Sequence, residues 1–278
     1  RRKCGDVRIQ SALLSKCLMQ DSAALDRRCR LRDDPGAFFG RSPGRIWQTF
    51  CGEKRMIYPN ISKARFLDRT NRFSARAEID GRIENVHVKN TGRCRELLLP
   101  NVSVILAKSR NPDRKTQYDL IAVKKKGLGW VNIDSQAPNK VMREWLEIQH
   151  YDKIQGEYVY GESRIDFYME QGEQKYLLEV KGCTLEIDGV GYFPDAPTER
   201  GVKHLRTLIK ARNEGYWCGV AFVIQMPKVR EVRPNIGTHP EFGNALEEAR
   251  AAGVHVLFLG CKVRPDLLSV DKARVFVQ

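Results

Sequence analysis

The residues best suited to chemistry lie in the C-terminal half of this 278-residue chain, on two stretches with the pattern of β-strands. In the first stretch, the two-residue period of a strand places Asp166 on the face opposite the apolar Ile165 and Phe167. In the second, Glu179 and Lys181 share a face, with Cα atoms about 6.6 Å apart. The pattern therefore predicts two carboxylates and an ammonium on neighbouring strands.

A turn predicted at residues 171–174 makes these strands an antiparallel pair and brings Asp166 close to Glu179. Two carboxylates at short range repel unless a cation lies between them, and their hard oxygens favour Mg²⁺ or Mn²⁺. Lys181 can stabilise charge that develops on a phosphate, or position the attacking water. This D-x12-E-x-K spacing is that of PD-(D/E)XK restriction-type nucleases. The spacing alone also fits a Glu-Lys pair on a solvated strand face.

Further residues are candidates for the same site. Glu144, on a predicted helix, and Glu157, at the edge of the preceding strand, could each complete the metal shell. Gln225 closes an apolar strand and either faces the metal cleft or is a satisfied edge residue. The eight cysteines are scattered, with no CxxC pair and no His at metal-ligand spacing, so we predict free thiols and no zinc.

The formal net charge of +14 is unevenly distributed. Residues 1–60 carry 13 Lys+Arg against 6 Asp+Glu, residues 61–138 carry 16 against 8, and residues 139–278 carry 19 against 20. A basic middle segment beside a balanced C-terminal one favours a module that attracts a polyanion and another that acts on it. A basic domain with no such partner is the alternative.

Candidate DNA contacts come from the basic segment and from a later helix. That helix carries a polar, mostly basic stripe at Arg200, Lys203, Thr207 and Lys210, which either follows a phosphate backbone or is a solvated face. His204, beside the stripe, is a candidate phosphate contact, although a lone helical His is more often structural. The predicted DNA-binding residues are Arg72, Asn90, Arg93, Arg114, Lys115, Arg164, Arg200, Lys203 and His204.

The elements that position these residues divide the chain into three parts. Residues 1–55 have irregular apolar spacing and are predicted to be a disordered or non-native extension before Met56, with a basic DNA-contacting arm as the alternative. Residues 56–138 are predicted to form a small oligonucleotide-binding (OB-like) β-barrel. Its expected strands are residues 72–79, 83–88, 102–108, 118–123 and 130–133.

Residues 139–278 alternate between helix and strand patterns, which predicts an α/β domain with a mixed sheet of four or five strands. Helices are expected at residues 139–150, 198–213 and 240–252. Strands are expected at residues 156–160, 164–170, 175–185, 219–225 and 254–259. The fold class is thus α+β with two domains, the second resembling a restriction endonuclease. The chain has neither a long apolar run nor a secretory signal, so we expect a cytoplasmic protein with no membrane partner.

Several rare sequence words, occurring in order, resemble the sugar fermentation stimulation protein family. The words are Asn71-Arg72-Phe73, His87 with Asn90-Thr91-Gly92, Arg114-Lys115-Thr116, Ser163–Phe167, Glu179-Val180-Lys181, Phe193–Thr198 and Arg200–Leu205. The resemblance covers about residues 64–259. It implies an OB barrel, a nuclease-like domain and DNA binding with little sequence preference.

By the same resemblance, Asp166, Glu179 and Lys181 take the metal and catalytic positions, and Glu144 matches a helix glutamate of the family. The leading hypothesis is a DNA-binding protein with a Mg²⁺- or Mn²⁺-dependent nuclease site, and a homodimer is a further expectation. The alternative is a non-cleaving DNA-binding regulator of sugar (maltose-type) metabolism genes, which the family name favours. A sugar-metabolism enzyme or sensor has no sugar-site signature in its support.

Overall fold

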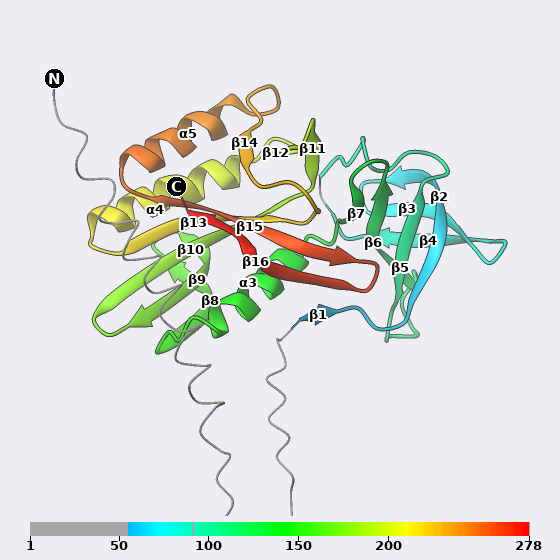
Figure 1. The fold of residues 1–278 in the computed structure, drawn as a ribbon, viewed down its shortest axis with the longest axis horizontal. Coiled ribbons are helices and arrows are strands. Elements are labelled where there is room, and N and C mark those ends of the chain that lie inside the picture. Colours follow the sequence, from blue (N-terminus) through cyan, green and yellow to red (C-terminus); the bar gives the residue numbers. More distant parts are fainter. Residues whose placement is uncertain (1–54, 91, 278) are drawn as a thin grey trace, which may run out of the picture. The chain divides into compact units, whose positions relative to one another are not determined.

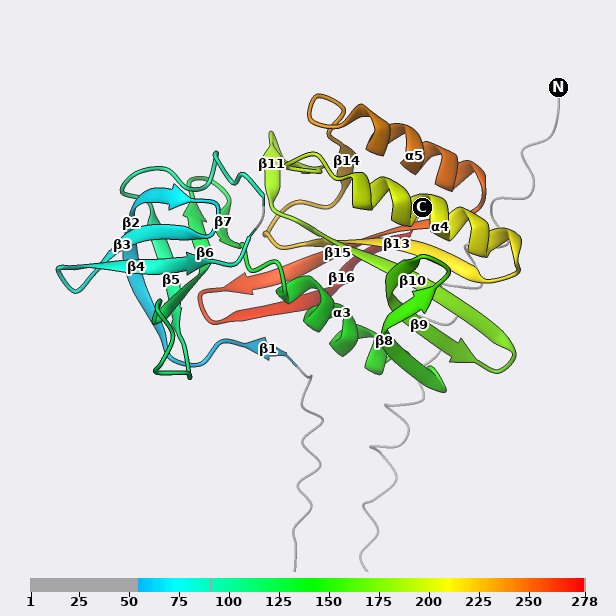
Figure 2. The same cartoon turned by 180° about the vertical axis from the view of Figure 1, so that it is seen from behind.

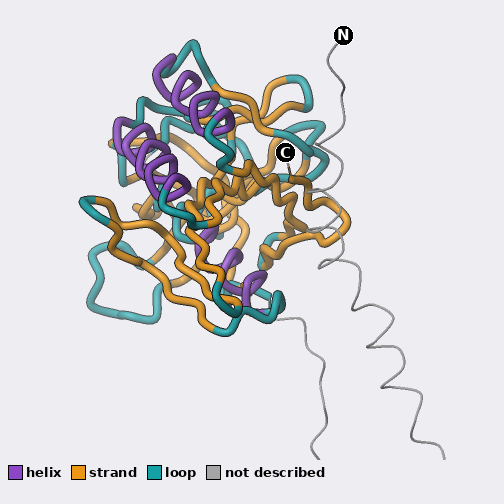
Figure 3. Tube along the Cα trace, turned by 90° about the vertical axis from the view of Figure 1, so that its left-hand side faces the viewer, coloured by secondary structure: helices purple, strands orange, loops and turns teal. Residues whose placement is uncertain are grey.

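The computed structural model describes residues 55–90 and 92–277, so the predicted extension lies outside the described residues except for Arg55. The described chain consists mainly of strands, as Figure 3 shows. It forms a barrel followed by a second domain that contains helices (Figure 1). None of the helices in the described ranges is long and apolar enough to cross a bilayer.

The N-terminal barrel is built on one six-stranded sheet. Its strands are β2 (Ile61–Asn71), β3 (Ser74–Ile79), β4 (Arg82–Val88), β5 (Ser103–Lys108), β6 (Tyr118–Lys125) and β7 (Gly129–Asn132). They pair in the order β4-β3-β2-β5-β6-β7, and an additional parallel pairing of β4 with β6 closes the first five into a barrel. The predicted OB barrel is confirmed.

Strand β2 was missed by the sequence analysis, which began the first strand at Arg72. The reason is its composition, since Phe66 is the one fully buried residue of this strand and most of the others are charged or polar. Arg72 and Phe73 form the turn between β2 and β3 instead of belonging to a strand.

The second domain is built on a seven-stranded mixed sheet, in the order β1-β16-β15-β13-β10-β9-β8. Its strands are β1 (Met56–Ile57), β8 (Lys153–Tyr160), β9 (Ser163–Gln171), β10 (Gln174–Cys183), β13 (Trp217–Ile224), β15 (His255–Arg264) and β16 (Leu267–Val277). Strands β10, β13 and β15 run parallel, and the remaining pairings are antiparallel.

The mixed sheet is confirmed, but the expected four or five strands were too few. Strand β16 folds back on β15, and its polar middle, around Asp271 and Lys272, hides it from a search for apolar runs. Strand β1 adds the edge, so Met56 and Ile57 pair with the second domain although they had been assigned to the barrel segment. A small separate sheet was also missed because its strands are short: β11 (Leu185–Ile187), β12 (Val190–Phe193) and β14 (Val232–Pro234).

Helices cover both faces of the large sheet (Figures 1 and 2). Helices α4 (Glu199–Asn213) and α5 (Pro240–Ala251) pack on one face through residues such as Leu205 and Leu246. Helix α3 (Ala137–Glu147) packs on the other face through Val141 and Met142. We call these the α4 side and the α3 side. Thr198, at the predicted start of α4, caps it by accepting a hydrogen bond from the Gly201 amide at 3.1 Å.

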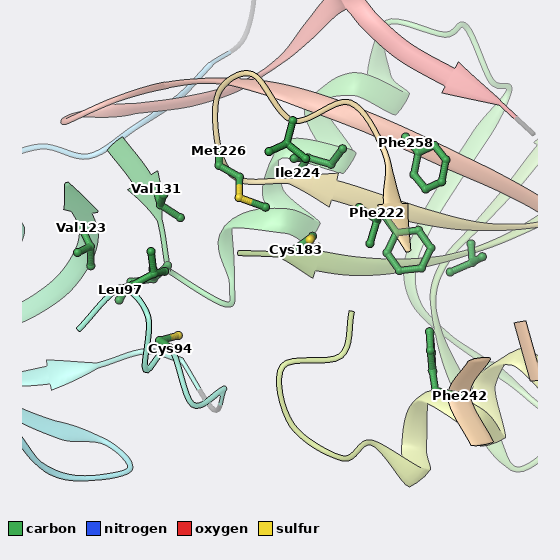
Figure 4. Packing of buried hydrophobic residues seen from close by; sticks show 14 of the residues in the cluster. Cys94, Leu97, Val123, Val131, Cys183, Phe222, Ile224, Met226, Phe242 and Phe258 are labelled. Atoms are coloured by element: carbon green, nitrogen blue, oxygen red, sulfur yellow. The ribbon is translucent and has the colours of Figure 1, made fainter. Parts of the chain in front are cut away.

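The core on the α4 side continues from the second domain into the barrel. Figure 4 shows Leu97 and Val131 of the barrel in the same cluster as Cys183, Ile224 and Met226. A backbone hydrogen bond also crosses this junction, because the Asn132 amide of the barrel donates to the Gln225 carbonyl of the second domain at 2.9 Å. The Gln225 amide in turn donates to the Cys183 carbonyl within the second domain at 3.0 Å. The described cysteines, Cys94, Cys183, Cys218 and Cys261, are buried free thiols, and the other four lie outside the described residues.

Candidate active site and basic groove

Asp166 lies where strands β9 and β10 separate. The pairing of β9 with β10 ends at Phe167 and Leu178. Beyond this pair, the Asp166 side chain takes the place of a backbone partner. Its Oδ2 accepts a hydrogen bond from the Val180 amide at 2.7 Å, and its Oδ1 accepts one from Asn139 Nδ2 of α3 at 2.8 Å. The carboxylate is thus fixed between two elements and is held at a fork in the sheet.

The fork also breaks the side-chain alternation of β9. Ile165 packs in the core cluster of the α4 side, whereas Phe167 packs in the cluster of the α3 side. The predicted common face for Ile165 and Phe167 is therefore wrong, because a strict two-residue period holds only where the strand pairing is regular. The alternation predicted for β10 is confirmed, with Leu177 on the α4 side and Leu178 on the α3 side.

Glu179 is a buried carboxylate on β10, with 2% of its surface exposed. Its Oε1 accepts a hydrogen bond from Lys181 Nζ at 2.5 Å and lies 2.5 Å from His204 Nδ1. Its Oε2 is buried and has no hydrogen-bond partner among the described residues. Since a buried carboxylate oxygen without a partner is costly, this atom marks a position that suits a bound cation or water.

His204 is the residue that the sequence analysis placed differently. Expected beside Lys203 as a phosphate contact, it is buried, with 4% of its surface exposed, and packs against Glu179. Arg200 Nε donates a hydrogen bond to His204 Nε2 at 3.3 Å, so this nitrogen is the acceptor. The imidazole proton consequently lies on Nδ1, which donates to Glu179.

The two carboxylates experience opposite electrostatic effects. Burial, followed by the nearby Glu179, raises the pKa of Asp166 above its ordinary value. Burial would also raise the pKa of Glu179, but Lys181 and His204 outweigh it and lower that pKa. Glu179 therefore keeps its negative charge, and Asp166 is the carboxyl that gains most from a cation.

Glu144 and Glu157 were also predicted as metal ligands. Glu144 is half-buried on α3, five residues beyond Asn139 and about 7.5 Å further along the helix axis. Glu157, on β8, is exposed and lies 3.5 Å from Arg164 in an ion pair, and Arg164 is equally exposed. Asp166 and Glu179 thus form the centre of the candidate site. Within the described ranges, no three His, Cys, Asp or Glu side chains are grouped as a metal site.

Gln225 stabilises the domain junction. Its buried Nε2 donates to Asn132 Oδ1 at 2.9 Å and to the carbonyls of Asn132 and Asp134 at 3.2 and 3.1 Å. Of the two interpretations offered for Gln225, these contacts support the satisfied residue.

A basic groove of about 580 Å³ lies between the barrel and the segment before α4. It is lined by Arg69, Asn71, Arg72, Gly92, Arg93, Arg95, Ala196 and Pro197. Of the predicted DNA contacts, Arg72 and Arg93 therefore lie in one groove. Asn90 has a structural role beside it, because its Nδ2 donates to the Ile133 carbonyl at 2.8 Å and its Oδ1 accepts from the Gly92 amide at 2.7 Å.

Arg69, which the sequence analysis missed together with β2, holds one side of the groove. Its guanidinium donates hydrogen bonds to the carbonyl oxygens of Arg72, Asn90, Gly92 and Arg93, at 2.6 to 3.0 Å. These four acceptors come from the β2–β3 turn and from the loop after β4. Arg69 thus joins the two loops through its hydrogen bonds.

Asp195 of the second domain holds the same loop from the other side. Its Oδ2 accepts a hydrogen bond from the Cys94 amide at 2.8 Å. A Cβ added to Gly92 would lie 2.7 Å from this oxygen, so a glycine is needed for the close approach. Residues of both domains therefore form the walls of the basic groove.

The remaining predicted DNA contacts lie elsewhere. Arg114 is half-buried and forms an ion pair with Asp119 of β6, with Nη2 2.9 Å from the carboxylate, whereas the neighbouring Lys115 is exposed. Lys203 lies 3.6 Å from Glu162 in an ion pair. A second groove, of about 430 Å³, runs along α4 and is lined by Glu199, Val202, Lys203, Arg206, Thr207 and Lys210.

The fold defines a two-domain α+β protein with an N-terminal OB barrel and a mixed-sheet domain that holds two carboxylates and a lysine at a strand fork. Family models match both parts, one described as the SfsA N-terminal OB domain over residues 67–133 and one as the sugar fermentation stimulation protein RE domain over residues 136–267. The chain belongs to the sugar fermentation stimulation protein family.

Individual relatives agree with this assignment. The sugar fermentation stimulation protein homolog of Desulfitobacterium hafniense (strain DSM 10664 / DCB-2) is 53% identical over 214 residues, covering 76% of this chain and 93% of its own. The homolog of Clostridium beijerinckii is 49% identical over 219 residues, covering 77% and 96%. The solved structure of Pyrococcus furiosus SfsA in complex with Ca²⁺ is 27% identical, with a TM-score of 0.70, over 78% of this chain and 96% of that one.

Proposed function

We propose that this protein binds DNA with little sequence preference and carries a divalent-metal-dependent phosphodiesterase site of the nuclease type. The observation that carries the proposal is the buried, unpartnered Oε2 of Glu179, beside the carboxylate of Asp166 at the strand fork. A buried anion needs a compensating charge, and Lys181 and His204 both engage Oε1.

Asp166 and Glu179 would hold the metal, with Glu144 of α3 as the third candidate. Two carboxylates are sufficient for Mg²⁺, which usually keeps several of its waters. When bound, the cation would act as a Lewis acid on a phosphate oxygen and on a water molecule. The ammonium group of Lys181 lies next to the carboxylate of Glu179, where it can stabilise negative charge on a phosphate. The Ca²⁺ complex of the Pyrococcus furiosus relative supports a divalent cation in this fold.

DNA binding is supported by the distribution of charge. The basic groove presents exposed guanidinium groups at Arg72, Arg93 and Arg95. The arginine-rich surface suits a phosphate backbone and requires no particular base sequence.

The second candidate is a DNA-binding regulator that keeps the nuclease framework without turnover. One observation favours it: the described residues include no third acidic or His side chain grouped with Asp166 and Glu179 as a metal site. The complete set of Asp166, Glu179 and Lys181 favours the enzyme.

A cleavage assay with plasmid and oligonucleotide DNA, in Mg²⁺ and in Mn²⁺, separates the two. We expect the wild type to cleave and Lys181→Ala to lose cleavage while retaining DNA binding. Lys175→Ala is the matched control, because Lys175 is an exposed lysine on the same strand, and it should cleave normally. A wild type that binds DNA and Mn²⁺ but cleaves nothing would favour the regulator.

A further inference from the structure

The turn between β2 and β3 holds an aromatic side chain on a fixed backbone. The Phe73 amide donates to Asn71 Oδ1 at 2.9 Å, and the Phe73 carbonyl accepts from the Val88 amide at 2.8 Å. The carbonyl of Arg72, the other turn residue, accepts from Arg69 at 2.6 Å. Hydrogen bonds with residues of two strands, β2 and β4, therefore fix the two-residue turn.

The ring of Phe73 is not used by the core. It is 50% exposed, and the guanidinium carbon of Arg72 lies 5.8 Å from the ring centroid. Two-residue hairpin turns favour Asn, Asp and Gly, so neither the turn nor the core explains a phenylalanine here. Single exposed apolar side chains are common, so the exposure of Phe73 alone indicates no function. Its position beside other functional candidates does.

Those neighbours are the residues of the basic groove. Asn71 and Arg72, which directly precede Phe73 in the chain, line the groove together with the exposed Arg93 and Arg95. Among the described residues, no acidic side chain lines it. The opposite wall, Ala196 and Pro197, is small and uncharged. An exposed ring on a hydrogen-bonded backbone thus directly follows two residues that line the arginine-rich groove.

We propose that the basic groove binds a single strand of nucleic acid, with its phosphates on Arg72, Arg93 and Arg95 and one base stacked on Phe73. This inference rests on the proposed DNA binding and deepens it by naming an unpaired strand as the ligand. The reason is that stacking needs a free base face, and a duplex hides its base faces except at its ends. Arginine guanidinium groups bind phosphates of either form, so Phe73 provides the discrimination.

The test measures binding by fluorescence anisotropy with labelled oligothymidylate and with a blunt duplex of the same length, in EDTA. Base stacking on an aromatic ring contributes about 1 to 3 kcal/mol, so Phe73→Ala should weaken single-strand binding by roughly 5- to 150-fold. Duplex binding should change less than about two-fold, which is the range of a surface substitution. Phe73→Trp, which keeps a stacking surface, should retain single-strand affinity.

Ile83→Ala is the matched control, because Ile83 is an exposed apolar residue at the start of β4 in the same barrel, 63% exposed. It should change neither affinity, and thermal melting confirms that each variant is folded. The inference is overturned if Phe73→Ala weakens single-strand and duplex binding equally, or neither, or if Ile83→Ala has the same effect. If the wild type binds neither probe, the proposed DNA binding itself fails. EDTA keeps this result independent of cleavage.

Discussion

His204 Nδ1 lies 2.5 Å from Glu179 Oε1, and both side chains are buried. Arg200, at the exposed end of this chain of contacts, fixes the acceptor at Nε2. The imidazole therefore donates to one carboxylate oxygen and leaves the other, Oε2, as the one without a partner. His204 acts on the site through Glu179 and is a positioning residue in the proposed mechanism.

We expect His204→Leu to weaken Mn²⁺ binding by about 10- to 100-fold, the usual effect of removing a residue that orients a metal ligand. His204→Asn should restore most of the affinity, because its Nδ2 can take the place of the imidazole Nδ1 as the donor. Calorimetry without nucleic acid measures both variants. Equal losses for Leu and Asn would show that the packing of the ring matters and the hydrogen bond does not.

Asp166→Asn should stabilise the protein in EDTA and remove its response to metal. The pKa of this carboxyl is raised in the folded state, so its ionisation disfavours folding, and stability falls as pH rises from the ordinary value of 3.8 through the folded-state pKa. The substitution removes that loss at neutral pH. In the wild type, Mn²⁺ at 100 times its dissociation constant should add about 2.7 kcal/mol to the free energy of unfolding.

Thermal or urea unfolding with and without Mn²⁺ tests both parts of the Asp166 prediction. Asp113→Asn, at an exposed loop carboxylate of the barrel, should leave the metal response intact. A wild type whose stability does not respond to millimolar Mn²⁺ would remove the support for the metal site.

Arg69→Lys should destabilise the protein by about 1 to 3 kcal/mol, because a lysine cannot donate to the four carbonyl oxygens that the guanidinium reaches. Arg95→Lys, in the same groove but exposed, should change stability by less than about 0.5 kcal/mol. Urea unfolding measures the difference. Similar effects at both positions would mean that charge, and not the hydrogen-bond geometry, is what the groove requires.

The sequence predicted the parts of the site that depend on regular local patterns. Strand β10 alternates regularly, so Glu179 and Lys181 were correctly placed together on its α4 side. His204 was a candidate phosphate contact because it lies beside Lys203 and the polar stripe, and its burial agrees with the structural alternative. It shares the helical spacing of the buried Leu208, four residues later, and that spacing was the available signal.

Other features depend on contacts between distant segments, which periodicity cannot detect. At the fork, the Asp166 carboxylate accepts one hydrogen bond from the Asn139 side chain and one from the Val180 amide, and these donors lie far from each other in the sequence. The Arg69 contacts require that two loops 20 residues apart, around Arg72 and Gly92, already be adjacent. Neither arrangement leaves a pattern in its own stretch of sequence.

The hydrogen bond from the Cys94 amide to Asp195 joins the barrel to the second domain beside the basic groove, so the shape of the groove depends on both domains. One wall belongs to the barrel and the other, Ala196 and Pro197, to the second domain. A nucleic-acid strand that contacted both walls, as proposed, would favour their association, so its binding and the association of the two domains would strengthen each other by the same free energy. The groove is therefore shared between the domains, and a barrel separated from the second domain would retain all of the lining arginines but lose Ala196 and Pro197.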